Sequence, residues 1–335
     1  MKAVYFEKHG TIDNLIFGDW PDPTPGPAQC LVRVKAVSLN GFDPMVLRGI
    51  PGLKTPLPMI PGADFAGDVV SIGANVPPGR FKPGDRVQVI PYWPPMGMMG
   101  ETLRGGCCEL VAVDHVQLLP IPDAVSYVDA ATLPTAYGTA LRMVKVRGEI
   151  EPNEVVLVLG ATGGVGTCAV QLCKLRGATV VACASSAWKS ERLKQLGADM
   201  VIDTSTQNFV EVLHGKFGKP RIWGESGGVD VVINYIGGDT WVNSLKVLKR
   251  SGRMLTCGAT AGYAPPEDIR YIWSFEHKII GSNAWLPEDQ VELLRLVENG
   301  SLKPVVDRVI PLARFTEGLQ AQMDRQVFGK VVLEP

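Results

Sequence analysis

The sequence lacks an excess of basic residues, and its composition is typical of neither membrane-spanning nor disordered chains. Lys and Arg number 33 against 34 Asp and Glu, which gives a formal net charge of −1 and leaves no basic surplus to neutralise a phosphate polymer. Hydrophobic residues make up 46% and charged residues 20% of the chain, close to the averages of soluble globular proteins. We therefore expect no nucleic-acid partner and no membrane partner.

We also expect neither a signal peptide nor a disulfide framework. No long apolar run follows the positive charge near Met1, so the first residues read as a short strand and we expect a cytoplasmic protein. The seven cysteines are odd in number and scattered, with only Cys107 and Cys108 adjacent. We interpret these two as buried, reduced thiols, since a metal site would need distant partners.

Two patterns divide the 335 residues, a length that suffices for two domains. In residues 1–124, short alternating segments such as 30–37 and 85–90 are separated by turns and by proline-rich stretches. This pattern predicts a partly open β-barrel wrapped by loops. We expect the C-terminal segment 286–335, with a helix at 289–298 and a strand at 330–333, to return to this domain.

Residues 125–285 instead alternate apolar strands with helices, which predicts a doubly wound parallel sheet and places the chain in the α/β class. The expected strands are residues 154–159, 179–184, 200–202, 229–234, 252–257 and 278–284. The expected helices are residues 127–147, 165–176, 190–196, 208–213 and 241–248.

A glycine-rich turn follows the first of these strands. A dinucleotide pyrophosphate needs backbone N–H groups that it can approach closely and the positive end of a helix, and glycines between a strand and a helix supply both. The motif G-x-G-x-x-G is not matched literally, because Ala161 occupies the first glycine position. A tight connection in another α/β protein would look similar, but the long strand and helix alternation favours phosphate binding. The candidate residues are Ala161, Thr162, Gly163, Gly164, Val165 and Gly166.

The end of the second strand favours NADPH over NADH. An NAD site carries an acid there, which binds the ribose hydroxyls and would repel a 2′-phosphate. This strand ends without an acid, and Ser185, Ser186 and Lys189 follow as groups able to bind phosphate. The alternative for Lys189 is an ordinary solvated lysine.

These residues and several further motifs resemble the medium-chain dehydrogenase/reductase superfamily, in its quinone oxidoreductase and enoyl reductase branch. The resemblance implies a GroES-like barrel domain, a Rossmann domain for NADPH and an active site in the cleft between them. It also implies that Asn40 and Thr135 lie near the nicotinamide and Lys330 near the cleft. The motifs, which cover nearly the whole chain, are residues 37–43, 48–49, 60–67, 81–87, 105–106, 135–140, 161–166 and 329–333.

The resemblance also has a clear departure, because the zinc ligands of the alcohol dehydrogenases in this superfamily are missing. Those enzymes carry a Cys in the first motif and a His-Glu pair in the third, whereas this chain has Asn-Gly-Phe-Asp at 40–43 and Gly-Ala-Asp at 62–64. The four-cysteine lobe of a structural zinc is absent from residues 92–100 as well. We expect no metal, since tetrahedral zinc wants about three or four His, Cys or carboxylate ligands.

Without a Lewis acid, hydride addition to a C=C bond conjugated to a carbonyl, or to a quinone, is favoured over alcohol oxidation. Asn40 is the expected positioning group, and Tyr92 is a candidate proton donor at the end of a barrel strand. Tyr92 also suits a packing role, with water as the proton source. Two alternatives remain: an alcohol dehydrogenase with an atypical zinc on Asp43, Asp64 and a third ligand, and a non-catalytic NADPH-binding protein.

An apolar strand at 279–285 predicts self-association. We expect it at the edge of the parallel sheet, where an unpaired backbone is open to a second copy. The expected assembly is a homodimer or a homotetramer acting on a small molecule.

Overall fold

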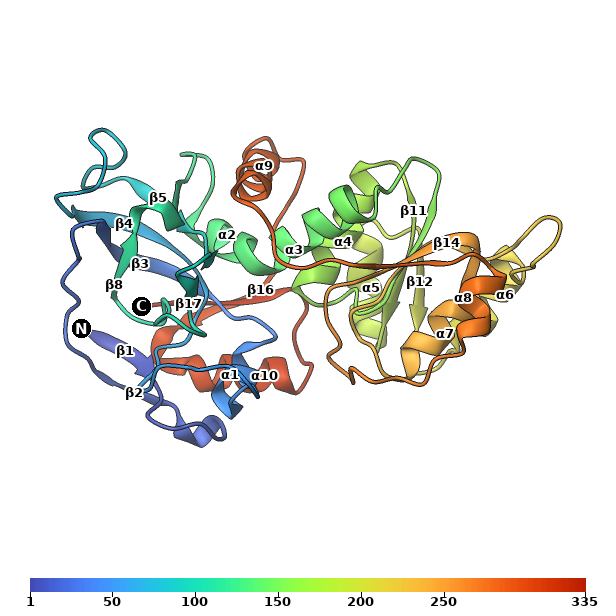
Figure 1. Cartoon of the computed structure of the whole chain (residues 1–335), viewed down its shortest axis with the longest axis horizontal. Helices are drawn as coiled ribbons and strands as arrows, with labels where there is room; N and C mark the ends of the chain where they lie inside the picture. Colours follow the sequence, from blue (N-terminus) through green and yellow to red (C-terminus); the bar gives the residue numbers. More distant parts are fainter. The chain divides into compact units, whose positions relative to one another are not determined.

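The computed structural model describes residues 1–335 and divides them into two compact units (Figure 1). The first unit contains Met1–Gly138 and Leu286–Pro335, and the second contains Thr139–Trp285. The first unit therefore runs to Gly138 rather than to Ala124, because the helical segment after Tyr127 packs on its strands. The second unit has the parallel sheet expected for the α/β class.

A seven-stranded sheet forms the first unit, with the order β16-β17-β3-β4-β5-β9 and β8 paired to β3. One edge of β3 pairs with β4 along its length, and the other pairs with β8 in its first half and with β17 at its end. Two smaller sheets pair β1 with β2 and β6 with β7. The strands are β1 (Lys2–Tyr5), β2 (Ile16–Asp19), β3 (Gln29–Ser38), β4 (Asp64–Ile72), β5 (Arg86–Val89), β6 (Tyr92–Trp93), β7 (Gly97–Met98), β8 (Leu110–Asp114), β9 (Leu118–Pro120), β16 (Val306–Pro311) and β17 (Lys330–Glu334).

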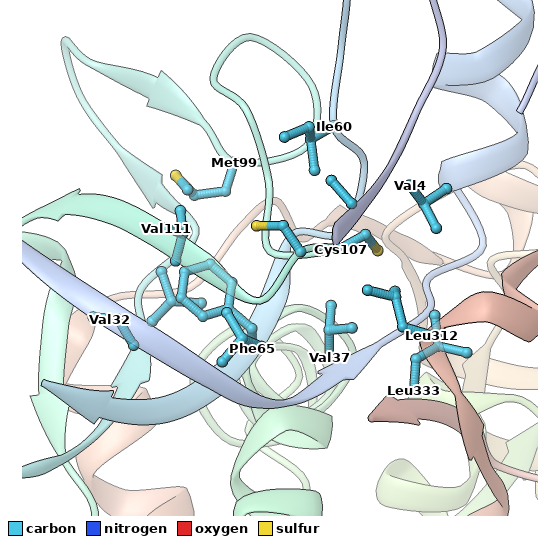
Figure 2. Close-up of a cluster of buried hydrophobic side chains, with 14 of the residues drawn as sticks. Val4, Val32, Val37, Ile60, Phe65, Met99, Cys107, Val111, Leu312 and Leu333 are labelled. Atoms are coloured by element: carbon cyan, nitrogen blue, oxygen red, sulfur yellow. The ribbon is translucent and has the colours of Figure 1, made fainter. Parts of the chain in front are cut away.

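The inward side chains of these strands form one apolar core, shown in Figure 2. Phe65 of β4 lies among valines of β3 and β8, and Leu333 brings the C-terminal strand into the same core. Cys107 and Cys108 are buried there, which agrees with their interpretation as apolar thiols, and all seven cysteines are free. Burial raises the pKa of Cys108 to about 12.

Short helices and turns complete the first unit. They are η1 (Ile12–Asn14), α1 (Asp43–Arg48), η2 (His115–Gln117), α2 (Tyr127–Thr132), η3 (Leu133–Tyr137), α9 (Pro287–Glu298), η5 (Leu312–Arg314) and α10 (Phe315–Met323).

The second unit is a six-stranded parallel sheet with the order β12-β11-β10-β13-β14-β15. Its strands are β10 (Val155–Val158), β11 (Thr179–Ala184), β12 (Met200–Asp203), β13 (Val229–Ile233), β14 (Leu248–Thr256) and β15 (Lys278–Gly281). Its helices are η4 (Arg142–Arg147), α4 (Gly164–Leu175), α5 (Ala187–Gln195), α6 (Phe209–Phe217), α7 (Asp239–Val247) and α8 (Ile269–Ser274), with α3 (Gly138–Leu141) beginning at the last residue of the first unit.

The helix expected over 127–147 is not a regular α-helix. It alternates between α-helix and π-helix, and the segment η3 is the first of the two π-helical stretches. Pro134 lies inside η3, and its missing N–H prevents a regular ladder of hydrogen bonds there. Helix periodicity in the sequence does not reveal such a local widening, which is common at functional sites.

Candidate active site

Three strands of the first unit bring polar residues to one end of its sheet. Asn40 follows the end of β3, Asp64 is the first residue of β4, and Lys330 is the first residue of β17. The strand registers explain why they meet, because Ser38 of β3 pairs with Asp64 on one side and with Val332 of β17 on the other. The N-terminal and C-terminal segments thus contribute to one site.

Asn40 links the two charged groups. Lys330 Nζ donates a hydrogen bond to Asn40 Oδ1 at 2.6 Å and lies 3.8 Å from Asp64 Oδ2. Asn40 Nδ2 in turn donates to Asp64 Oδ2 at 2.8 Å. All three side chains are buried, and the most exposed of them, Asn40, is only 4% exposed. The hydrogen bonds within this network therefore replace those that the three groups would make with water.

Thr135 and Asp43 complete the polar cluster. Thr135 Oγ1 donates to Asp64 Oδ1 at 2.5 Å, and the Thr135 N–H lies 3.1 Å from Asp64 Oδ2. Asp43 Oδ2 accepts the N–H of Asn40 at 2.7 Å, whereas its buried Oδ1 has no hydrogen-bond partner. The polar cluster therefore consists of Asn40, Asp43, Asp64, Thr135 and Lys330.

The charges in the polar cluster are unbalanced, with two carboxyl groups and one ammonium. Burial raises the pKa of Asp43 to about 7, and this rise is opposed by the Asn40 N–H and by the positive charge of Lys330. Burial also raises the pKa of Asp64, against Lys330 and the hydrogen bonds from Thr135 and Asn40. Burial lowers the pKa of Lys330, against the two carboxylates. A proton on Asp43 relieves the excess negative charge.

The segment η3 is fixed on both sides of Thr135. Gln290 Nε2, on α9, donates to the carbonyl oxygen of Pro134 at 2.9 Å. Tyr137 Oη accepts the N–H of Val305 at 2.7 Å. The C-terminal part of the first unit thus holds Thr135 against Asp64.

In the second unit, glycines of the turn between β10 and α4 serve different purposes. Gly160 has φ +69°, and a Cβ on Gly166 would lie 2.3 Å from the Gly160 carbonyl oxygen, so both positions require glycine for the protein's own packing. A Cβ on Gly163 would meet no atom closer than 3.8 Å. Gly163 is exposed at the N-terminus of the twelve-residue α4, which leaves the backbone open to a ligand.

The other predicted turn residues lie around this opening. Ala161 is buried below the turn, where a Cβ on Gly166 would come within 2.6 Å of its Cα. Thr162 and Val165 are half-buried, and Gly164 is the first residue of α4.

This turn follows β10, the strand from which successive strands are added first on one side of the sheet and then on the other. From β10 the chain proceeds to β11 and β12 on one side, and then crosses to β13, β14 and β15 on the other. Dinucleotides bind at such a switch point, outside the carboxyl ends of the strands. Tyr235, just after β13, donates a hydrogen bond from Oη to the Gly160 carbonyl oxygen at 2.5 Å.

Sequence reasoning missed Tyr235 and its neighbour Asn234. Asn234 Oδ1 accepts the N–H groups of Ile236 and Gly237 at 3.0 and 3.1 Å and so shapes the loop after β13. The signal was available, because both residues follow a parallel strand that neighbours the glycine turn.

Ser185, Ser186 and Lys189 follow β11 at the same edge of the sheet. Ser185 is exposed, whereas Ser186 Oγ is buried without a hydrogen-bond partner. Lys189 is only 3% exposed, with its Nζ 5.3 Å from the ring centroid of Trp188. Lys189 is therefore not the ordinary solvated lysine that the sequence allowed as an alternative.

Tyr92 lies outside the polar cluster. It belongs to the two-residue strand β6 in a separate hairpin, is 41% exposed and makes no hydrogen bond with the polar cluster. The hypothesis of an atypical zinc site also required a third ligand, and the structure contains no group of three His, Cys, Asp or Glu side chains able to hold a metal ion.

Comparisons with known proteins agree with this architecture. Residues 26–123 match the model of the alcohol dehydrogenase GroES-like domain, and residues 164–299 match that of the zinc-binding dehydrogenase family. The synaptic vesicle membrane protein VAT-1 homolog of Homo sapiens is 31% identical, over 93% of this chain and 80% of that protein. The chain belongs to the medium-chain dehydrogenase/reductase superfamily.

Two further likenesses bear on the branch of this superfamily. NADPH-dependent alkenal/one oxidoreductase from Arabidopsis thaliana is 30% identical, over all of this chain and 80% of that protein. A crystal structure of an NAD-dependent alcohol dehydrogenase superposes with a TM-score of 0.92 and 33% identity, covering both chains fully. The resemblance to the quinone and enoyl reductase branch is confirmed, as is the GroES-like and Rossmann fold, and the chain is an oxidoreductase of this superfamily. None of its helices has the length and apolar character needed to cross a bilayer.

The raised pKa of Asp43 predicts a dependence of stability on pH. Between the ordinary pKa of about 4 and the folded-state value of about 7, the folded chain holds a proton that the unfolded chain releases. The free energy of unfolding should therefore fall as pH rises through this window, by up to about 1.4 kcal/mol per pH unit from this group. Asp43→Asn should flatten that slope in urea unfolding measured at several pH values.

The matched control is Asp123→Asn, because Asp123 is an exposed carboxylate of the same unit. Its slope should follow that of the unsubstituted protein. Parallel curves for the Asp43→Asn variant and the unsubstituted protein would show that Asp43 is ionised throughout.

Proposed function

We propose that this oxidoreductase uses NADPH to reduce a C=C bond conjugated to a carbonyl, or a quinone, without catalytic zinc. The observation that carries the proposal is the polar cluster, in which a buried ammonium and an amide gather at one end of the sheet with no thiolate or imidazole among them. Such donors stabilise an enolate oxygen, whereas zinc prefers softer or imidazole ligands.

The second unit fits a phosphorylated dinucleotide. The open face of Gly163 and the N-terminus of α4 suit the pyrophosphate, and the partnerless hydroxyl of Ser186 suits an additional phosphate oxygen. Ser185 and Lys189 would complete the contact to a 2′-phosphate, with no acid at the end of β11 to repel it. When bound, the reduced nicotinamide supplies the hydride.

The residues of the first unit would orient the reactants. Asn40 and Lys330 are the proposed hydrogen-bond donors to the nicotinamide end of the cofactor and to the substrate oxygen, and Asp64 fixes both of them. Thr135 is the half-buried member of the polar cluster and thus its proposed contact to the cofactor. Tyr92 lies outside the polar cluster but is 41% exposed, and it remains the proposed proton donor.

Substrates should be small molecules reduced in the cytoplasm. The name of the Arabidopsis relative, an alkenal/one oxidoreductase, supports an enone as the first substrate class to test.

A panel of enones, quinones and enoyl thioesters, assayed with NADPH and NADH in parallel, tests this function. We expect oxidation of NADPH with at least one class, and unchanged turnover after treatment with a chelator. Loss of turnover on chelation, restored by Zn²⁺, would contradict the proposal, as would binding of NADPH with no turnover across the panel.

The cofactor preference can be tested at the end of β11. Ser185→Asp places a carboxylate where an NAD site carries one, next to the proposed 2′-phosphate. We expect the ratio of kcat/KM for NADPH to that for NADH to fall by at least about ten-fold, which corresponds to about 1.4 kcal/mol. Ser185→Asn is the control, because Asn has the shape of Asp without its charge, and it should change this ratio much less. Equal effects of the two variants would contradict the proposed contact between Ser185 and the 2′-phosphate.

We also propose a homodimer or homotetramer assembled through the open edge of the second unit. β15 is the last strand of the parallel sheet, and this edge position is the one expected from the sequence. The strand is shorter than expected, since it ends at Gly281. Trp285, which we expected on this strand, is buried.

The mass in solution tests this assembly. We expect light scattering to give two or four chains, and Ile279→Lys to lower that mass, because a lysine on an edge strand opposes pairing with another strand. Val291→Lys, on the exposed face of α9, is the matched control and should leave the mass unchanged. A single-chain mass for the unsubstituted protein would contradict the proposal.

A further inference from the structure

The loop between α6 and β13, residues 218–228, projects from the second unit as the yellow loop beyond α6 in Figure 1. Its two ends are closed, because the N–H of Gly228 donates to the carbonyl oxygen of Phe217 at 3.2 Å. Inside the loop, Ser226 Oγ accepts the N–H of Arg221 at 3.1 Å. We call this segment the Trp223 loop; its closed base holds the tip in a defined shape.

The tip of the Trp223 loop is apolar and exposed. Trp223 has 80% of its surface exposed and Ile222 has 38%, whereas Trp241 of the same unit packs against the core. Arg250 contacts both residues of the tip. Its Nη1 donates a hydrogen bond to the Ile222 carbonyl oxygen at 3.3 Å, and its Cζ lies 5.9 Å from the Trp223 ring centroid. An indole held outward in this way exposes a large apolar surface that the fold itself does not cover.

Three basic side chains precede this tip in the sequence. Lys216, Lys219 and Arg221 are all exposed within the seven residues that precede Trp223. Two nearby acids are already engaged, because Asp230 pairs with Lys249 and Glu276 pairs with Arg250. Residues 209–228 contain two acids, Glu211 and Glu225, and both are exposed. Counting only the unengaged groups, the region carries more positive than negative charge.

We propose that the Trp223 loop docks onto a membrane surface that contains anionic lipid. The exposed side chains of Trp223 and Ile222 suit insertion into the headgroup region of a bilayer. Tryptophan is enriched at this depth of a bilayer, and lysine and arginine beside it are attracted by anionic headgroups. Two apolar residues form no apolar run, and for this reason the composition of the sequence predicted no membrane partner.

Sedimentation of the full chain with vesicles tests the proposal. We expect binding to phosphatidylcholine vesicles that contain phosphatidylserine, much weaker binding to phosphatidylcholine alone, and weakening by salt. Lys219→Gln should lower the partition coefficient about five-fold, the equivalent of one basic contact. Trp223→Ala should lower it further, with an unchanged melting temperature because the side chain is exposed.

Trp273→Ala is the matched control, since Trp273 is also largely exposed but lies on α8, where Asp268 pairs with Arg270. It should leave vesicle binding unchanged. Equal binding to neutral and anionic vesicles, equal losses in the two tryptophan variants, or no sedimentation would overturn the proposal. A lower oligomer mass for Trp223→Ala without vesicle binding would also overturn it and would identify the loop as a protein contact.

Discussion

The first unit depends on the interaction between Lys330, Asn40 and Asp64. Burying an ammonium and a carboxylate costs several kcal/mol per ion unless each finds partners, and the amide of Asn40 provides one hydrogen bond to each. Lys330 begins β17, Asp64 begins β4 and Asn40 follows the end of β3, so the polar cluster can form only when the C-terminal strand is in the sheet. The charge balance of the site therefore depends on the return of the C-terminal segment to this sheet.

The glycines of the turn between β10 and α4 have two different roles, one in packing and one in leaving the backbone open. Gly160 and Gly166 are needed because any side chain would strike the protein itself, whereas the Cβ position of Gly163 is open. Ala161, which stands in place of the first glycine of the motif, is fully buried, whereas the backbone of Gly163 is exposed.

The sequence predicted most strands and helices of the parallel sheet, because buried parallel strands are continuous apolar runs and the intervening helices have a distinct period. Strand ends were less accurate: β15 stops at Gly281, before the polar residues Ser282 and Asn283, although we expected the strand to continue to Trp285. By resemblance, the sequence predicted Asn40 and Thr135 near the nicotinamide and Lys330 near the cleft, and the structure brings the three residues into one polar cluster. From the sequence we interpreted Asp43 and Asp64 only as possible metal ligands. Their place in the polar cluster depends on the pairing of Ser38 with Asp64 and on the register of β17, and the local order of polar and apolar residues does not reveal either.

Asp43 determines the charge that the polar cluster presents. If both carboxyl groups were ionised, the site would carry a net negative charge and would oppose a developing enolate. With its pKa raised to about 7, Asp43 holds a proton in part of the population near neutral pH, which leaves the Lys330 ammonium balanced by Asp64 alone. The partnerless Oδ1 of Asp43 favours the same outcome, because an ionised oxygen without a donor is costly in a buried position. For the proposed reduction, burial of Asp43 thus keeps the positive end of Lys330 available where negative charge develops on the substrate oxygen.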